Sequence, residues 1–189
     1  MLKNLLLFSL VLFLATTASA WAAVPDGNWA SVPNASKVSY KIVHKFHEVE
    51  GVSTQVEGRA VVTGGQVQIQ VRIPVSSFNS GNANRDSNAL SVVDGEHTPY
   101  VMLKGEGKVC DPAAANCTFV LHSQLSFHGV AIPYDVNVDV TPGESGRMNA
   151  HFVLPVTLTK HAIELPSLLF IPIDDFMKVE GTIVMEHKS

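Results

Sequence analysis

Two histidines, His44 and His47, lie three positions apart in the stretch YKIVHKFHEVEG. On one face of a helix, paired imidazoles at such a spacing supply half of a zinc site. On a β-strand, residues an odd number of positions apart point to opposite faces, so this pair cannot chelate one ion without a bulge. The chemistry open to these histidines therefore depends on the backbone that carries them.

The two cysteines, Cys110 and Cys117, flank a Pro-containing segment between two strand-like runs. In an oxidising compartment, a pair this close in sequence is expected to form a structural disulfide. Redox pairs favour C-x-x-C spacing, and one cysteine pair makes a poor zinc site. We therefore predict a disulfide, which contributes roughly 2–3 kcal/mol for a loop of this size.

The neighbours Arg85 and Asp86 could be taken for a catalytic pair, but a structural role is favoured. They lie in the segment 82–99, which predicts a short helix with Asn84 or Asp86 as a cap and Gly95 just beyond its end. Arg85 is then expected to pair with a nearby carboxylate or carbonyl group. Ion pairs of this kind are common and contribute little.

Other signs of catalysis are weak. The sequence has no G-x-S-x-G, H-E-x-x-H or phosphate-loop motif, and the GEG at 105–107 is a pair of glycines within a strand. His122 and His128 are six positions apart on one predicted strand, outward-facing and too distant to act together. We expect no enzymatic activity, no metal site and no cofactor.

Residues 1–22 have the features of a secretory signal peptide. A single charge at Lys3 precedes an apolar run over 5–15, and small residues in A-x-A spacing allow cleavage after Ala20 or Ala22. The run is too short to span a membrane. The expected location is the periplasm.

Residues 23–189 have the length of one domain, without internal repeats or linkers. The formal net charge is −4, and Lys and Arg are scattered singly rather than clustered. The chain therefore lacks the cluster of positive charges that a nucleic-acid-binding surface requires.

Alternation of apolar and polar residues is the dominant pattern from Lys37 onward. In GQVQIQVRI, the apolar positions Val67, Val71 and Ile73 alternate with glutamine and arginine. Period-two alternation is typical of an antiparallel strand with one buried face. The sequence contains eight such runs, interrupted by the helical segment and by a proline-rich crossover at 158–176.

Eight alternating strands form a sandwich or a closed barrel. We predict an all-β fold, an eight-stranded antiparallel lipocalin-like barrel. A ligand in its lumen would contact inward-facing residues of several strands. The predicted lumen residues are Val38, Tyr40, Ile42, His44, Phe46, Phe119, Leu121, Phe127, Tyr134, Phe152 and Leu154.

In this interpretation His44 is in phase with the apolar face of a strand running from Val38 to Phe46, whereas His47 points to solvent. A metal site between them is disfavoured. An inward imidazole needs a polar partner. His44 is either a core histidine bonded to a backbone carbonyl or to Tyr134, or a polar anchor for a ligand headgroup.

Three segments resemble the YceI-like family of exported, lipocalin-like proteins that bind polyisoprenoid lipids. They are FHEVEGVSTQVEG, SSFNSGNANRDSNALSVVDGEHTPYVML and LSFHGVAIPYDVNVDV. The second is similar to the family pattern S-x-x-T-G-N…R-D-x-x-L…D…P, and the third to L-x-x-H-G-V-T. The matching positions are Ser77, Gly81, Asn82, Arg85, Asp86, Leu90, Asp94, Pro99, Tyr100, Leu125, His128, Gly129 and Val130.

The resemblance covers the chain from about Ser36 onward and implies a barrel with a short helix near one end and a prenyl chain in the lumen. It leaves a homodimer open. The chain departs from the family pattern where Val92 and Val93 replace aromatic residues, and in the crossover TLTKHAIEL. These departures leave the ligand's identity and length open.

Two alternatives remain. The lumen could take a fatty acid or amide instead of a prenyl chain, or a filled barrel could act through its outer surface as a partner-binding, stress-associated module. The barrel is filled if the inward phenylalanines meet at its axis, namely Phe46, Phe119, Phe127 and Phe152. It holds a channel if the small inward residues leave one, namely Gly58, Ala60, Ala150 and Gly181.

Overall fold

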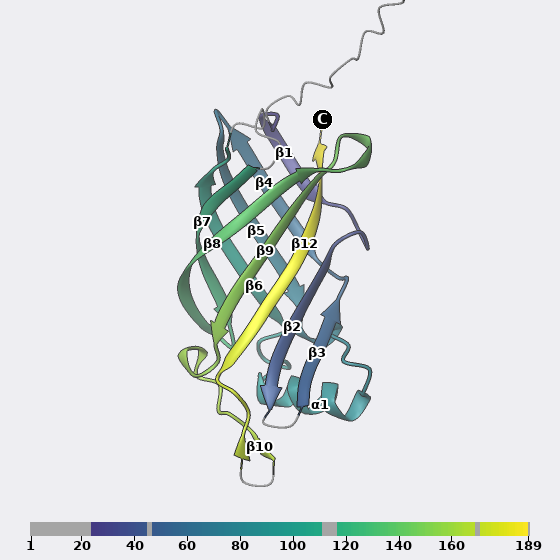
Figure 1. The fold of residues 1–189 in the computed structure, drawn as a ribbon, viewed down its shortest axis with the longest axis vertical. Helices are drawn as coiled ribbons and strands as arrows, with labels where there is room; N and C mark the ends of the chain where they lie inside the picture. The colour runs from purple at the N-terminus through teal and green to yellow at the C-terminus, as the bar shows by residue number, and fades with distance from the viewer. Residues whose placement is uncertain (1–23, 45–46, 111–116, 169–170, 189) are drawn as a thin grey trace, which may run out of the picture.

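The computed structural model describes residues 24–44, 47–110, 117–168 and 171–188 (Figure 1). The predicted signal peptide, residues 1–22, lies outside this part of the chain. Within the described ranges, no helix has both the length and the apolar character needed to cross a membrane.

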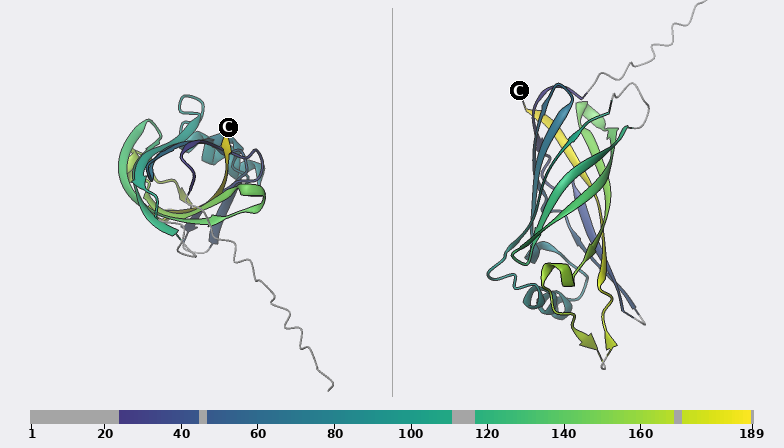
Figure 2. Two further views of the ribbon diagram at one scale, coloured as in Figure 1. Left: turned by 90° about the horizontal axis from the view of Figure 1, so that it is seen from above. Right: turned by 90° about the vertical axis from the view of Figure 1, so that its left-hand side faces the viewer.

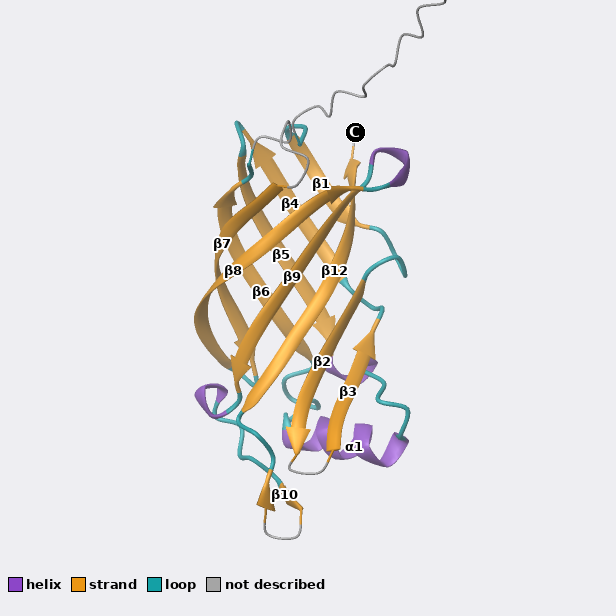
Figure 3. Cartoon of the chain, in the orientation of Figure 1, coloured by secondary structure: helices purple, strands orange, loops and turns teal. Residues whose placement is uncertain are grey.

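The chain is built almost entirely from strands, with one α-helix (Figure 3). The strands are β1 Gly27–Ser31, β2 Lys37–His44, β3 His47–Ser53, β4 Glu57–Thr63, β5 Gln66–Pro74, β6 Tyr100–Lys108, β7 Cys117–Phe127, β8 Val130–Pro142, β9 Met148–Thr157, β10 Ser167–Leu168, β11 Ile171–Pro172 and β12 Phe176–Lys188. The helices are α1 Ala83–Val92 and the 3₁₀ turns η1 Val75–Ser77, η2 Glu144–Gly146 and η3 Thr159–His161.

One antiparallel sheet closes into a barrel through β1, which pairs with both β4 and β12 (Figures 1 and 2). Strands β1 and β2 pair with successive parts of β12, so together they occupy one strand position of the barrel. Strand β4 pairs with β1 and strand β3 pairs with β2, so β3 and β4 together occupy the neighbouring position. The ten strands of the sheet, in the order β1-β4-β5-β6-β7-β8-β9-β12-β2-β3, therefore fill eight positions. The predicted eight-stranded antiparallel barrel with one short helix is confirmed.

Alternation along the strands produces the barrel's two faces. In β4 every second residue is buried, and β7 follows the same period. Because each strand has one apolar face, closing the sheet turns all of these faces toward one interior and leaves the polar residues outside.

The interior is filled at the end that carries β1 and the C-terminus, here called the closed end. Trp29 is buried there and its indole Nε1 donates a hydrogen bond to the Pro25 carbonyl at 3.1 Å. Glycines on the strands leave space that neighbouring side chains occupy: a Cβ at Gly107 would meet the Phe119 ring at 3.0 Å. At Gly181 a Cβ would lie 2.8 Å from Val38.

The turn after β2 differs from the prediction. The strand expected to run through Phe46 ends at His44, and His47 begins β3 as its direct cross-strand partner. The inference that the two histidines share one strand is therefore wrong. The dipeptide between them, Lys45–Phe46, lacks the Gly, Asn or Asp that marks tight hairpin turns, so alternation seemed to continue. Phe46 and the His44 side chain lie outside the described residues.

Candidate functional site: an apolar cavity at the open end

The opposite end of the barrel, which carries α1 and the β10–β11 pair, is called the open end (Figure 1). The barrel interior between this end and the level of Ala150 and Ile183 encloses a cavity of about 360 Å³. Seven of the predicted lumen residues line this cavity: Val38, Tyr40, Ile42, Leu121, Phe127, Phe152 and Leu154. A cavity with this apolar lining suits a hydrophobic ligand.

The remaining predicted lumen residues have other positions. Phe119 packs toward Gly107, and Tyr134 contacts His161. Of the four small residues that could have left a channel, only Ala150 lines the cavity, and Gly58 and Gly181 face packed side chains. The lumen is thus filled near the closed end and hollow from the level of Ala150 to the open end.

Two segments that the lumen prediction missed cover the cavity at the open end. Helix α1 contributes Ala89, Val92 and Val93, and the crossover contributes Leu158 and Ile163. The α1 residues recur at the i, i+3, i+4 spacing of a helix with one apolar face. That spacing was visible in the sequence, but nothing in it indicated which part of the barrel the face covers.

Four polar side chains belong to the described lining, at the α1 side: Tyr40, Arg85, Asp86 and Asn88. Burial raises the pKa of the Tyr40 hydroxyl; the negative charge of Asp86 raises it further, and the positive charge of Arg85 opposes the shift. The lining is otherwise apolar. A ligand that fills the cavity therefore meets hydrogen-bonding and charged groups only at this side.

The position of the Tyr40 ring depends on a glycine. Tyr40 and Gly51 are cross-strand partners, and a Cβ at Gly51 would lie 2.4 Å from the ring. The ring also packs against Phe78, with centroids 5.4 Å apart. Because glycine has no side chain, the Tyr40 ring can lie directly over the Gly51 backbone. The ring is thus held between Gly51 and Phe78.

Helix α1 begins differently from the prediction. Its N-cap is Asn82, whose Oδ1 accepts from the Arg85 backbone N–H at 3.1 Å, rather than Asn84 or Asp86. The Asp86 carboxylate instead accepts from the Ser80 N–H at 3.1 Å and so holds the preceding turn. The described residues provide no ion-pair partner for Arg85, whose side chain is exposed beside the cavity.

A buried histidine, His161, joins the crossover to the barrel. Its side chain is fully buried, and its Nδ1 donates to the Val130 carbonyl at 3.1 Å. The Nε2 of the neutral ring then accepts from the Tyr134 hydroxyl at 3.3 Å. Burial lowers the pKa of His161, which keeps the imidazole neutral. Tyr134, which the sequence offered as a partner for His44, is bonded to His161.

His128 also differs from the prediction, because it lies in a turn rather than on a strand. With φ of 50° at His128 and 73° at Gly129, the turn between β7 and β8 has both central residues in the left-handed region, as a type I′ hairpin requires. His128 Nδ1 donates to the His161 carbonyl at 3.0 Å. The turn and the crossover are thereby tied together at the open end.

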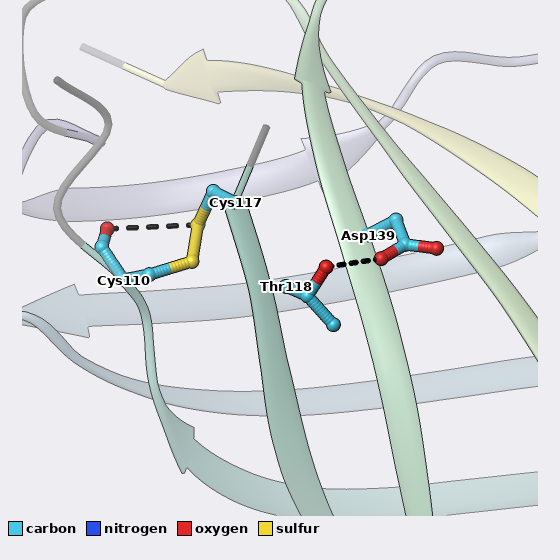
Figure 4. The surroundings of a disulfide bond; sticks show 4 residues. All are labelled: Cys110, Cys117, Thr118 and Asp139. Atoms are coloured by element: carbon cyan, nitrogen blue, oxygen red, sulfur yellow. Dashed lines mark hydrogen bonds between the residues drawn. A yellow bond between two sulfur atoms is a disulfide. The ribbon is translucent and has the colours of Figure 1, made fainter. Parts of the chain in front are cut away.

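The disulfide Cys110–Cys117 is confirmed and lies at the closed end, away from the cavity (Figure 4). Beside it, the Thr118 hydroxyl donates to Asp139 on the outer face. The residues described contain no cluster of three or more histidine, cysteine, aspartate or glutamate side chains arranged to hold a metal ion.

A closed antiparallel barrel with an apolar internal cavity defines the class of barrels that can enclose one hydrophobic ligand. The chain belongs to the family of the YceI-like domain, whose family model matches residues 29–185. No match is found among curated proteins.

Solved structures share the fold at low sequence identity. A polyisoprenoid-binding domain from Saccharophagus degradans, implicated in plant cell wall breakdown, has a TM-score of 0.69 and 15% identity, covering 85% of this chain and 98% of that one. BcnA of Burkholderia cenocepacia has a TM-score of 0.69 and 16% identity, covering 82% and 98%. A Campylobacter jejuni YceI protein has a TM-score of 0.61 and 11% identity, covering 78% and 89%.

Proposed function

We propose that this protein is exported to the periplasm and there carries or sequesters a long apolar lipid of the isoprenoid class. The observation that supports this proposal best is the cavity at the open end, whose described lining is apolar except at α1. The first 22 residues have the features of an export signal. A solved structure with the same fold is described as a polyisoprenoid-binding domain.

Affinity in such a cavity comes mainly from apolar surface removed from water, at roughly 25 cal/mol per Å². An unbranched or prenyl chain gains this energy along its whole length, whereas a few polar groups set its orientation. The ligand is expected to place its chain toward Phe152 and its polar end beside Tyr40, Arg85 and Asp86.

Mass spectrometry of protein purified from a periplasmic extract without detergent tests the proposal. A stoichiometric prenyl lipid or isoprenoid quinone would support it, and a fatty acid or amide would move the ligand to another lipid class. An empty protein that also fails to bind added isoprenoids, quinones and fatty acids would contradict it. That outcome would favour a module that acts through its outer surface.

A further inference from the structure

The open end of the barrel exposes large apolar side chains around the cavity. Both exposed aromatic residues of the described chain lie there: Tyr100 is 38% exposed and Phe176 is 62% exposed. Val43, at the end of β2, is 49% exposed. Its carbonyl accepts from the Asp174 N–H at 3.0 Å, which brings the β2 end beside the segment that leads into β12.

These side chains lie on opposite sides of the barrel. Tyr100 begins β6 and Phe176 begins β12, and three of the eight strand positions lie between β6 and β12 in either direction around the closed sheet. A partner that contacts both aromatic rings therefore has to extend across the whole end of the barrel. A narrow peptide lying along one edge cannot do so.

The β10–β11 pair extends this end further. Ser167 pairs with Pro172 and Leu168 with Ile171, and the pair projects beyond the barrel, away from the closed end (Figures 1 and 2). The sequence from 167 to 172, SLLFIP, carries no charge. The nearest acidic residues in the sequence, Glu164 and Asp174, lie on either side of this pair and are exposed.

We propose that the open end docks on the surface of a lipid bilayer, with Phe176 and Val43 in the interfacial region and Tyr100 at headgroup level on the far side. Aromatic residues favour this interface, where one edge of the ring is apolar and the other is hydrated. The polar outer face of α1, with Asn84, Ser87 and Ser91 exposed, suits the headgroup layer. A lipid would then pass between bilayer and cavity without crossing water.

Glu164 and Asp174, on either side of the β10–β11 pair, would not be attracted to anionic lipids. The proposed contact with the bilayer is therefore hydrophobic rather than electrostatic. Contacts of this kind need no anionic lipid and persist at high ionic strength, whereas polybasic attachment is screened by salt. The inferred partner is therefore a zwitterionic bilayer. Only the purpose of docking rests on the proposed function; the attachment itself does not require a bound ligand.

Flotation with phosphatidylcholine vesicles, at low and at high salt, tests the proposal on the processed protein. We expect the protein to float with the vesicles in both conditions. The double variant Val43→Ser/Phe176→Ser should lower the ratio of bound to free protein by about tenfold or more, because it removes apolar side chains that the bilayer buries. The matched control is Val61→Ser/Val120→Ser, which removes two similarly exposed valines elsewhere on the outer surface.

Three results would overturn docking: no flotation of the unaltered protein, equal loss in the control variant, or a dimer that the open-end variant converts to a monomer without any vesicle binding. The last result would assign this surface to a second copy. Mass spectrometry of the same variants separates the two proposals. A variant that keeps its lipid but no longer floats supports docking, and an empty protein that still floats contradicts only the proposed function.

Discussion

The Tyr134 ring stacks on the imidazole of His161 at an interplanar angle of 10°, with 6.1 Å between centroids, and its hydroxyl lies 3.3 Å from Nε2. This contact joins β8 to the crossover segment that covers one side of the cavity. The imidazole is buried and neutral, so the stability of this end of the barrel is linked to its protonation.

Stability is expected to fall as the pH is lowered. Burial depresses the pKa of folded His161, so the unfolded chain takes up a proton first, near pH 6.5. The stabilisation is fully present above that value and is lost as the pH falls toward the folded-state pKa. Protonated His161 would meet His128, which also bonds to this segment, and the Tyr134 hydroxyl. Urea unfolding across this range should show a flatter pH dependence for His161→Gln; the same slope as the parent would contradict the assignment.

Tyr134→Phe should destabilise the protein at neutral pH by about 1–3 kcal/mol, because it leaves the buried Nε2 of His161 without a donor. The control is Tyr100→Phe, which removes the hydroxyl of an exposed ring and should change stability by less than about 0.5 kcal/mol. Denaturant midpoints compare the two. Equal effects would show that the Tyr134–His161 hydrogen bond contributes nothing specific.

Ala150→Phe should block ligand retention while the barrel still folds. Ala150 lines the cavity, so a larger ring can enter existing space instead of displacing packed neighbours. Val153→Phe, on the exposed outer face of the same strand, is the matched control. Native mass spectrometry and thermal unfolding of both proteins test the prediction, which fails if the Ala150 variant keeps a full complement of lipid.

Arg85→Gln should weaken binding of an isoprenoid phosphate by roughly threefold to tenfold relative to an uncharged isoprenoid quinone, since the guanidinium is exposed beside the cavity. Arg59→Gln changes the same charge on the outside of β4 and should affect both ligands alike. Competition binding with the two ligands measures the ratio. An unchanged ratio would remove Arg85 from headgroup recognition.

Gly51→Ala should cost about 1–3 kcal/mol, because the new methyl group would overlap the Tyr40 ring. In a Tyr40→Ala background the same substitution should cost much less, since the ring is gone. A double-mutant cycle by urea unfolding gives the coupling between the two positions. Additive effects would mean that Gly51 is needed for its backbone alone.

Much of the fold was predictable because alternation is a strong local signal. The faces of β4, β5 and β7 followed directly from it, and so did the eight strand positions of the barrel, although β1 was not predicted. The hairpin at His44–His47 was missed because its turn has no distinctive residues. The chain also leaves the sheet between β1 and β2 and between β3 and β4. Alternation of apolar and polar residues does not reveal these breaks.

The site was less predictable than the fold. Seven of the predicted residues line the cavity, because they face the interior and also lie at the level of the cavity. His161 was missed because its burial depends on contacts with β8 and the β7–β8 turn, far away in sequence. Likewise, Asn82 and Asp86 are both suited to cap a helix, and only the backbone start of α1 decides between them.

The interruption between β3 and β4 gives the barrel two mechanically different halves. Near the closed end, β4 pairs with β5 from Glu57 to Thr63 in an unbroken ladder. Toward the open end, the described chain joins the free edge of β3 through two backbone hydrogen bonds of 2.9 Å between Val52 and Asn79 and one side-chain hydrogen bond of 2.7 Å between Ser53 and Ser77. Breaking the bonds at this seam would release the β3 edge without shifting the register of any ladder. The barrel thus combines a continuously paired base with a sparsely bonded seam at the end that carries the cavity.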